Sequence, residues 1–353
     1  MKNTYTVESV TASHPDKMCD QISDAILDAY LAKDPYARVA MEAFGAHDIL
    51  VIGGEVTSSA NVDAENIARK LYFDEIGYED PLSITTNIIQ QSPDIAQGVD
   101  TGGAGDQGIM YGYATAETPE FLPKGVVTAH RLAQELEKLG KHDSECSWLR
   151  PKPSAHAKTQ VTICDGKITS ALVSCQHTEG TSQEDIITLL TKKLFQPVLG
   201  DLEGIEILVN PTGKFVVGGF VADTGLTGRK IMVDTYGGLI PHGGGAFSGK
   251  DATKVDRSAT YMARFAAKNI VAHGIAPECL VSVAYAIGRA EPLMVHAESG
   301  DGKDLSTVVR KYFDFRPHAI IERLNLRRPI YRQTAVYGHF GKAGLPWEEI
   351  VSL

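Results

Sequence analysis

The chain has 353 residues and a formal net charge of −10, and 43% of its residues are hydrophobic and 22% charged. These values are ordinary for a folded globular protein of about two or three domains. They exclude a general nucleic-acid binder, which needs clustered Lys and Arg, and no apolar run reaches the ~18 residues of a membrane span.

The predicted elements begin with an amphipathic helix in the segment that starts at Pro15, where a first helical turn tolerates proline. Strand-like runs follow at residues 37–45, 48–56, 83–90, 158–166, 167–177, 205–210, 229–234 and 280–288. Further amphipathic helices are expected at 61–76, 128–140, 182–195, 257–273 and 304–324. Strands come in hairpin-like pairs with helices between the pairs, so we expect an α+β fold with mostly antiparallel sheets.

Breaks in this pattern at residues 97–108 and 216–220 divide the chain into three parts of comparable size. Each part contains both strands and helices. We predict an N-terminal α+β unit at 1–98, a central α+β unit at 103–218 and a C-terminal α+β unit at 219–353 that carries a glycine-rich loop.

The five cysteines are odd in number and have no C-x-x-C spacing; they are Cys19, Cys146, Cys164, Cys175 and Cys279. This pattern supports neither a disulfide framework nor a zinc site. Residues 1–13 lack the basic start and apolar run of a signal peptide. We therefore expect a cytoplasmic protein with no membrane partner and no nucleic-acid partner.

The glycine-rich loop reads HGGGAFSGKDATKVDRS at residues 242–258. Gly244 to Lys250 match G-x-x-x-x-G-K, but Asp251 stands where a P-loop has the Ser or Thr that holds Mg²⁺. The loop is expected between a strand at 229–236 and a helix from 255, where backbone N–H groups can bind an anion. With Lys254, Asp256, Arg229 and Lys230 nearby, we interpret it as a cationic cradle for polyphosphate. The alternative is a glycine-rich surface turn before a helix.

A second candidate site is SHPDK at residues 13–17, at the start of the first helix. The residue types suit a metal-phosphate site, with Asp16 for Mg²⁺, Lys17 for charge and His14 as a hydrogen-bond donor to an oxygen that gains charge. The alternative is a capping box formed by Ser13 and Asp16, which needs no function.

Several weaker signals lie at turns and strand ends. Asp223, Arg229 and Lys230 flank a glycine-rich turn of the kind that usually joins two strands, and the two cations are expected on opposite faces of a strand. Asp165 and Lys167 flank a Gly that is typical of a type I′ turn. Other polar side chains follow or precede glycines, where they can reach a cleft; they are Glu55, Gln91 and Asp106.

The motifs together resemble the S-adenosylmethionine synthetases. The resemblance covers essentially the whole chain and includes ESVTASHPDKMCDQISDAILDAYL, GAGDQGIMYGYAT, TGLTGRKIMVDTYGG and HGGGAFSGKDATKVDRSATY. It implies three similar α+β units around a pseudo-threefold axis. It also implies a methionine adenosyltransferase, in which methionine sulfur attacks C5′ of ATP and the expelled triphosphate is hydrolysed to pyrophosphate and phosphate. The implied assembly is a homodimer or homotetramer with active sites between subunits.

The resemblance also implies roles for single residues. Catalytic roles fall to His14, Arg229, Lys250 and Asp106, and ATP contacts to His14, Asp165, Lys167, Lys214, Phe215, Asp223, Arg229, Lys230, Ala246 and Lys250. Methionine contacts fall to Glu55, Gln91, Asp223, Lys254 and Ile287. Asp16 and Asp256 would hold Mg²⁺, two ions per site, and Glu42 would hold K⁺. Lys214 stands where the family commonly has Arg, and the connection at 98–105 is shorter than the family's loop over the active site.

This reaction suits the residues, because a thioether is already nucleophilic and needs no general base. Catalysis then depends on alignment of the reacting atoms and on neutralising the departing triphosphate. Two other function classes stay open at this point. A P-loop ATPase or kinase would release ADP from ATP, and a non-catalytic nucleotide-binding protein would release no product.

Overall fold

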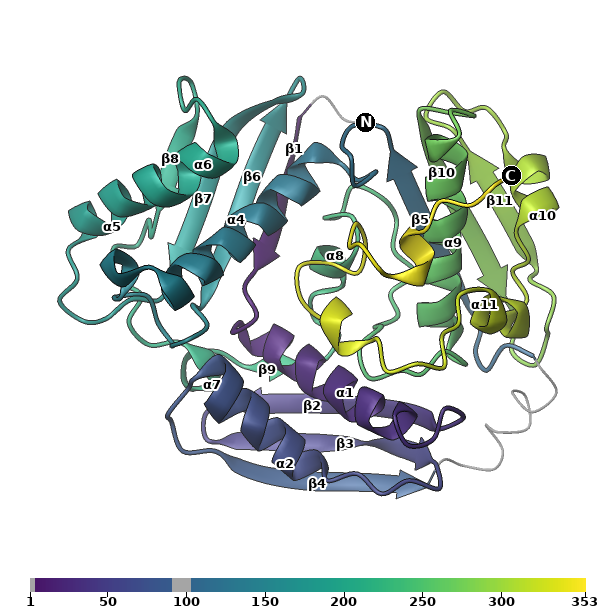
Figure 1. Ribbon diagram of the computed structural model, residues 1–353, viewed down its shortest axis with the longest axis horizontal. Coiled ribbons are helices and arrows are strands. Elements are labelled where there is room, and N and C mark those ends of the chain that lie inside the picture. Colours follow the sequence, from purple (N-terminus) through teal and green to yellow (C-terminus); the bar gives the residue numbers. More distant parts are fainter. Residues whose placement is uncertain (1–3, 91–102) are drawn as a thin grey trace.

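The protein is described by a computed structural model of residues 4–90 and 103–353. Three sheets, each with its own helices, surround the centre of the molecule, which is the arrangement expected for three α+β units about a pseudo-threefold axis (Figure 1). Of the strand pairings, β3 with β4 and β7 with β8 are parallel and the others antiparallel. The predicted α+β class with mostly antiparallel sheets is therefore confirmed.

The first sheet has the order β4-β3-β2-β9 and is covered by two helices on one face. Its strands are β2 (Arg38–Ala46), β3 (Ile49–Thr57), β4 (Ser83–Gln90) and β9 (Gly225–Leu226). The helices are α1 (Pro15–Leu31) and α2 (Ala64–Arg69), which continues as a π-helix over Lys70–Ile76.

The second sheet has the order β1-β6-β7-β8. Its strands are β1 (Thr4–Val10), β6 (Ala157–Cys164), β7 (Lys167–Cys175) and β8 (Glu206–Val209). The helices of this unit are α4 (Lys124–His142), α5 (Gln183–Leu190), a π-helix at Thr191–Phe195 and α6 (Gln196–Leu199).

The third sheet has the order β11-β10-β5, and α9 crosses it. Its strands are β5 (Gly108–Thr115), β10 (Glu278–Tyr285) and β11 (Met294–Glu298), and its helices are α9 (Val255–Ala272), α10 (Ser306–Tyr312) and α11 (Pro317–Arg323). Two short helices, α7 (Gly219–Ala222) and α8 (Ile231–Asp234), lie in the segment that precedes the glycine-rich loop.

The sheets take strands from segments far apart in the sequence. β1 pairs with β6, and β5 pairs with β10, so each of these sheets begins with a strand from an earlier part of the chain. The linear division into residues 1–98, 103–218 and 219–353 stays a prediction.

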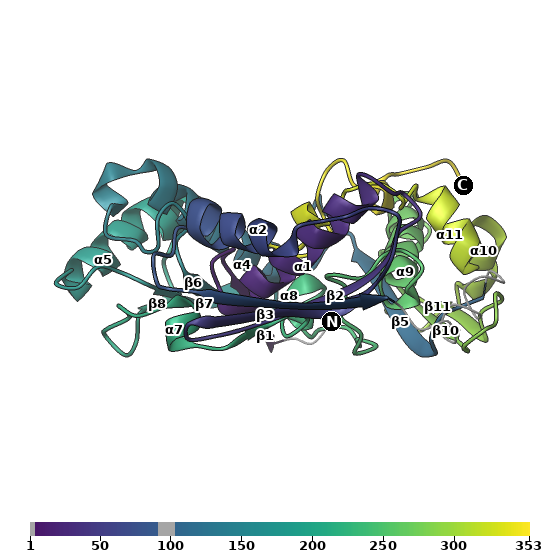
Figure 2. The same ribbon diagram turned by 90° about the horizontal axis from the view of Figure 1, so that it is seen from below.

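Strands and helices form two layers, with the strands on one side and α1, α2, α4 and α5 on the other (Figure 2). Along β2 the alternation is regular, because Val39, Met41 and Ala43 are buried toward the helices. Glu42 and Phe44 point from the opposite, exposed face. One face of the first sheet is therefore open.

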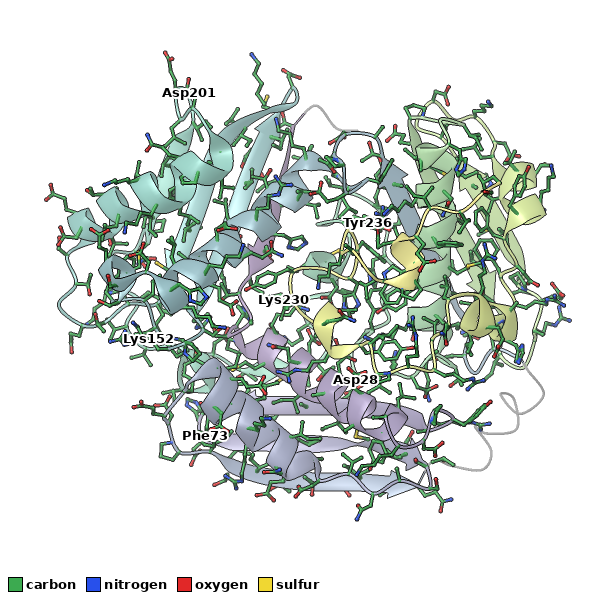
Figure 3. All side chains as sticks on the ribbon, in the orientation of Figure 1. Asp28, Phe73, Lys152, Asp201, Lys230 and Tyr236 are labelled. Carbon is green, nitrogen blue, oxygen red and sulfur yellow. The ribbon has the colours of Figure 1, made fainter. Side chains whose placement is uncertain are left out.

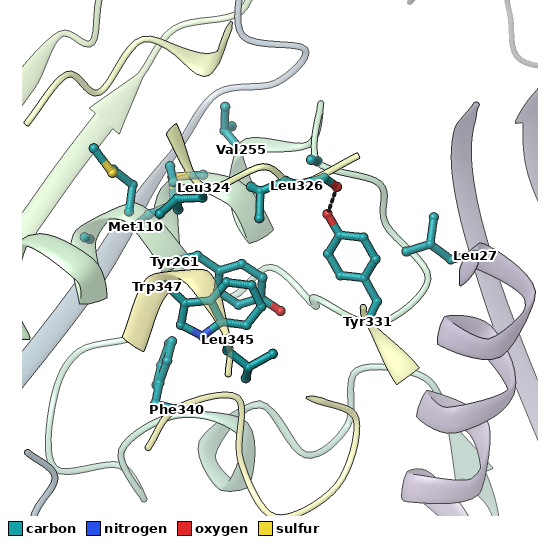
Figure 4. Packing of buried hydrophobic residues seen from close by; sticks show 14 of the residues in the cluster. Leu27, Met110, Val255, Tyr261, Leu324, Leu326, Tyr331, Phe340, Leu345 and Trp347 are labelled. Carbon is teal, nitrogen blue, oxygen red and sulfur yellow. Dashed lines mark hydrogen bonds between the residues drawn. The ribbon is translucent and has the colours of Figure 1, made fainter. Parts of the chain in front are cut away.

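The C-terminal segment crosses the centre of the molecule and closes the largest core (Figures 1 and 4). The ring of Trp347 stacks on Tyr261 of α9 with centroids 3.8 Å apart, and the hydroxyl of Tyr331 donates to the carbonyl oxygen of Leu326. This packing fixes α9, whose first turn borders the glycine-rich loop.

Two predicted elements are wrong. Residues 229–234 form no strand; Ile231–Asp234 are helix α8, because one helical turn directs both Lys230 and Asp234 to α1, where they bind Asp16 and Lys17. The helix predicted at 304–324 is two helices, since α11 begins anew at Pro317. No helix of the described residues is long and apolar enough to cross a membrane.

Candidate active site

α1 carries an aspartate at every fourth position along one side, namely Asp16, Asp20, Asp24 and Asp28. We call these four residues the aspartate ladder. All of them accept hydrogen bonds of 2.8–3.0 Å from backbone N–H groups that lie about 200 or more residues further along the chain; the donors are Leu226, Gly228, Gly249, Tyr331 and Arg332. α1 is therefore the support on which the loops of the site are fixed.

The first of these loops brings two cations to Asp16, which is buried. Lys230 Nζ donates to Asp16 Oδ2 at 2.5 Å, and Arg229 Nε lies 3.6 Å from Oδ1. Lys230 lies near the centre of the molecule, between the three units (Figure 3). The expectation that these two cations point to opposite faces of a strand is wrong, because both reach the same carboxylate.

The glycine-rich loop lies along the edge of β2. Met41 N–H donates to the carbonyl oxygen of Gly249 at 3.0 Å, and Lys250 pairs with Ala40. A Cβ on Gly249 would lie 1.9 Å from the carbonyl oxygen of Met41, and its φ is +81°, so only glycine fits here. Lys250 Nζ donates to Asp256 Oδ2 at 2.7 Å.

The loop is not a P-loop. The element before it is the short helix α8 and not a strand, so the expected strand-loop-helix context is absent. Asp251 is buried and accepts hydrogen bonds from the backbone N–H of Val39 at 2.7 Å and from Lys254 Nζ at 2.5 Å. It therefore anchors the loop to β2, which explains an aspartate where a P-loop has its metal-binding hydroxyl.

The two loops meet directly. A Cβ on Gly228, whose φ is +81°, would lie 2.4 Å from the Cβ of Ala246. The loop that carries Arg229 and Lys230 therefore touches the loop that carries Lys250. The cationic cradle itself stays a prediction.

His14 is the N-cap of α1, and its Nδ1 accepts a hydrogen bond from the backbone N–H of Asp16 at 3.2 Å. Because Nδ1 is the acceptor, the ring proton is on Nε2, which is buried and has no partner among the described residues. Burial, and then the nearby charge of Lys230, hold the pKa of His14 far below its ordinary value. His14 is therefore a neutral N–H donor. The capping box with Ser13 is not formed.

Lys17 is not available to a ligand. Its ammonium group is fully buried and is bound by Asp20 at 2.9 Å and by Asp234. The charge role expected for Lys17 in a phosphate site is wrong, because this side chain joins α1 to α8 inside the protein.

Glu42 and Glu55 lie on the open face of the first sheet, beside the glycine-rich loop. Ala40 is paired with Glu55 on one side and with Lys250 on the other. Glu42 is two residues further along β2 and therefore points from the same face. Lys254 is the N-cap of α9 and binds Asp251.

The other expected nucleotide contacts of this chain fall into two places. Phe215 is half-buried and contacts the ring of His156, whereas Lys214 is exposed and pairs with Glu179. Asp223 is exposed at the end of α7, in the segment that leads to Arg229.

Asp106 and Ile287 are exposed at one end of the third sheet. They lie near each other because the Ala104 segment is hydrogen-bonded to residues 288 and 289. This end of the sheet contacts the start of the glycine-rich loop, because a Cβ added to Gly243 would lie only 1.8 Å from the carbonyl oxygen of Ile109.

Asp165 and Lys167 do not join the other residues within one chain. They occupy the exposed turn between β6 and β7, where Asp165 has φ +48° and Gly166 φ +75°, in keeping with the predicted turn. β1 and β6 pair along their whole lengths, so this turn lies at the end of the sheet opposite to His14. The seven residues of β1 separate the two ends by about 20 Å at ~3.4 Å each. Gln91 and most of the connection at 98–105 lie outside the described residues.

Sequence reasoning missed three parts of the site. The spacing of four along α1 was a signal for the rest of the aspartate ladder, which holds both loops. Arg257 gave no signal, although its guanidinium binds Asp24 and the carbonyl oxygens of Phe247 and Lys250. His156, whose ring contacts His14, was also missed.

The donor set suits a metal that is bound mainly by its substrate. Within residues 4–90 and 103–353, no group of three or more His, Cys, Asp or Glu side chains gathers to hold a metal ion alone. Mg²⁺ commonly takes one or two protein carboxylates and completes its shell with water and phosphate oxygens. Asp16 and Asp256, beside the cations of the two loops, fit that use.

The fold and the site define a three-unit α+β protein in which two glycine loops that carry cations touch each other. Three family models match consecutive parts of the chain: the N-terminal domain of S-adenosylmethionine synthetase at residues 2–96, its central domain at 101–215 and its C-terminal domain at 217–349. The chain belongs to the S-adenosylmethionine synthetase family, as its motifs indicated.

Individual relatives agree with this assignment. The chain is 49% identical to an S-adenosylmethionine synthase of Pseudothermotoga lettingae over 99% of this chain and 97% of that protein. It is 48% identical to that of Desulforudis audaxviator, over 99% and 96%, and 49% identical to S-adenosylmethionine synthase 1 of Rhodospirillum rubrum, over 98% and 95%. The predicted enzyme class, a methionine adenosyltransferase, is thereby confirmed.

Proposed function

We propose that this chain joins methionine to the adenosyl group of ATP with the residues gathered over the N-terminus of α1. The observation that supports the proposal is the meeting of two glycine loops, one with Arg229 and Lys230 at Asp16 beside His14, and the other with Lys250 at Asp256. Three cations and a neutral donor suit a tetra-anionic triphosphate that departs from carbon.

In this reaction the methionine sulfur forms a bond to C5′ while the bond from C5′ to the triphosphate oxygen breaks. The electron pair of the broken bond stays on the triphosphate, and the sulfur becomes a sulfonium. No proton has to be removed from the nucleophile. His14 contributes as a neutral Nε2–H donor to the leaving oxygen, and Asp106 as a carboxylate that favours the sulfonium charge.

Substrate roles follow from position. Phe215, which contacts the His156 ring that also contacts His14, offers a ring to the adenine, and Lys214 and Asp223 are further proposed ATP contacts. Glu55, which lies across Ala40 from Lys250, and Lys254, which binds Asp251, are proposed methionine contacts together with Gln91 and Ile287, and Asp223 is shared.

Mg²⁺ would be held by Asp16 and Asp256, two ions per site, and K⁺ by Glu42 on the open sheet face. When bound, these ions supply positive charge for the triphosphate. Arg229, Lys230 and Lys250 then hold its oxygens in place through charge-assisted hydrogen bonds.

A second copy of the chain would complete the site. Asp165 and Lys167 lie at the far end of their sheet from His14, so their proposed nucleotide contacts require the turn of another subunit. The open face of the first sheet exposes Phe44, Ile49, Val51 and Ile89 beside Glu42, which supports a homodimer or homotetramer formed through this face. The five unpaired cysteines support a reducing, cytoplasmic location.

The proposal is tested by incubating the protein with ATP, methionine, Mg²⁺ and K⁺ and separating the products. We expect S-adenosylmethionine with pyrophosphate and phosphate. ADP would instead indicate a P-loop ATPase or kinase, and no product a nucleotide-binding protein without activity.

The cradle is tested by Lys250→Met, which removes a charge from the partly exposed pair with Asp256. We expect a loss of about 10²- to 10³-fold in kcat, the usual effect of one donor to a developing anion, with an unchanged unfolding midpoint. The matched control is Lys138→Met, from an exposed pair on α4, which should retain full activity. Activity of Lys250→Met equal to that of the control would refute the assignment.

A further inference from the structure

His156 lies between two proposed ATP contacts that come from distant parts of the chain. Its ring contacts His14 edge-on with centroids 5.5 Å apart, and Phe215 edge-on with centroids 5.1 Å apart. His14 is at the N-cap of α1 and Phe215 is in the connection between β8 and α7. Among the described aromatic contacts, His156 is the ring that joins these two residues.

The backbone of His156 is fixed to the second sheet. Its N–H donates to the carbonyl oxygen of Arg150 at 2.7 Å, and its own carbonyl oxygen accepts from the N–H of Gln176 at 2.8 Å. The ring is buried. The backbone of His156 is therefore held independently of His14 and Phe215, and its ring offers both residues a contact in a fixed position.

The orientation of the His156 ring is set through Nδ1. The backbone N–H of Gly219 lies 3.4 Å from this atom and the hydroxyl of Tyr78 lies 3.2 Å from it, so Nδ1 is an acceptor and the ring proton is on Nε2. Burial, followed by the charge of Lys158, lowers the pKa of His156 to about 3, so the ring is neutral.

The backbone at Gly218 packs closely against the ring of His156. A Cβ on Gly218 would lie 2.8 Å from His156 Nδ1 and 2.0 Å from Gln176 Oε1. The Tyr78 ring is itself held by stacking on Tyr72 with centroids 5.4 Å apart. The ring of His156 is thus packed against Gly218 and Tyr78 while it contacts both His14 and Phe215.

We propose that His156, oriented by Tyr78, is a positioning residue that sets the distance and angle between the His14 Nε2–H and the ring of Phe215. In the proposed function, these two groups bind opposite ends of the adenosyl unit: the leaving oxygen at C5′ and the adenine. His156 therefore fixes C5′ relative to the triphosphate cradle without touching the substrate. This inference rests on the proposed roles of His14 and Phe215.

The role predicts a selective defect. Nucleophilic attack at C5′ needs the adenosyl unit aligned with the cradle, whereas hydrolysis of added inorganic triphosphate needs only the cradle. A loss of alignment should lower S-adenosylmethionine synthesis and leave triphosphate hydrolysis. A general loss of structure should lower both in proportion.

The test substitutes His156→Asn, whose side-chain oxygen can still accept at the position of Nδ1 but which has no ring to contact His14 or Phe215. We expect kcat/KM for ATP to fall about tenfold or more, since small misplacements of reacting groups have large effects on rate. The KM for methionine and the rate of triphosphate hydrolysis should both stay within about twofold of the unaltered protein. Equal losses in synthesis and hydrolysis, or no loss in synthesis, would overturn the proposal.

Two further variants make the result decisive. Tyr78→Phe removes only the hydroxyl that orients His156 and keeps the stacked ring, so the same selective loss is expected at a few-fold; this variant decides the matter if His156→Asn does not fold. His14→Asn removes the proposed donor. If His14→Asn retains synthesis, the proposed function of the site fails; if it loses synthesis while His156→Asn and Tyr78→Phe do not, only the positioning role fails.

Discussion

Removal of one charge from the aspartate ladder should destabilise the protein and its site together. Asp24 and Arg257 are both fully buried, and two guanidinium nitrogens donate to the two carboxylate oxygens at 2.6 and 2.8 Å. Asp24 Oδ1 also accepts from the backbone N–H of Gly249 at 2.8 Å. In Asp24→Asn the guanidinium keeps its charge inside the protein but loses its counter-ion.

The magnitude follows from the burial. Breaking a fully buried ion pair by removing one partner costs about 3–5 kcal/mol, because the remaining charge is uncompensated. The entropy of unfolding of a chain of 353 residues is roughly 0.7 kcal/mol per kelvin. If the protein unfolds in one transition, the Tm of Asp24→Asn should therefore fall by about 4–7 °C. Synthesis of S-adenosylmethionine should fall as well, because the glycine-rich loop loses one of its anchors.

Scanning calorimetry measures the shift, and an exposed pair provides the control. Glu65 and Arg69 form an ion pair on α2 with side chains 46% and 44% exposed. Glu65→Gln should cost less than about 1 kcal/mol, which is about 1 °C or less for this chain. A Tm of Asp24→Asn that differs from that of Glu65→Gln by less than the error of the measurement would refute the reasoning.

Two other predictions concern the loop and His14. Gly249→Ala places a Cβ 1.9 Å from a carbonyl oxygen at a residue with φ +81°, so it should lower stability by about 2 kcal/mol or more and abolish synthesis. Gly244→Ala is the control, because that residue has φ +93° but no atom within 4 Å of the added Cβ, and it should lower stability less. Equal unfolding midpoints for the two variants would contradict this. His14 should show no NMR titration between pH 5.5 and 8, since its pKa is held far below 6.5. The unfolded chain binds that proton and the folded chain does not, so this residue lowers stability as pH falls below about 6.5, by up to ~1.4 kcal/mol per pH unit. A titration near 6.5 would contradict the burial argument.

Periodicity along the chain predicted seven of the strands and most of the longer helices, but it missed β1, β5, β9 and β11. β2, β3, β4, β6, β7, β8 and β10 follow the predicted strands, because their alternation or apolar runs reflect one buried face. The strand predicted at 229–234 is wrong because the apolar run there is only one helical turn long, and Val233 can be buried by a strand as well as by the helix that forms. The helix is favoured over the strand by the contacts of Lys230 and Asp234 with α1, and these contacts cannot be read from the local sequence.

The residues of the site stay a prediction, and the side chains that support its loops could not be predicted from the sequence. Arg229, Lys230 and Lys250 could be grouped because glycine loops with cations are typical of anion sites. Their separation from Asp165 and Lys167 could not be predicted, because it depends on the register of β1 with β6, which joins segments about 150 residues apart. The role of Asp251 was hidden for the same reason, as its partner Val39 is distant in sequence.

The cradle also explains how an acidic protein can bind a polyanion. Each of its lysines already has a carboxylate partner: Lys230 binds Asp16, and Lys250 binds Asp256. In the proposed function, a triphosphate that took both lysines would leave both carboxylates without counter-ions at the edge of a partly buried site, where an uncompensated charge is costly. Asp16 and Asp256 would each be able to hold a divalent cation, whose charge would remove that cost. In the proposed function, the ion pairs of the free protein would therefore make polyphosphate binding and metal binding depend on each other.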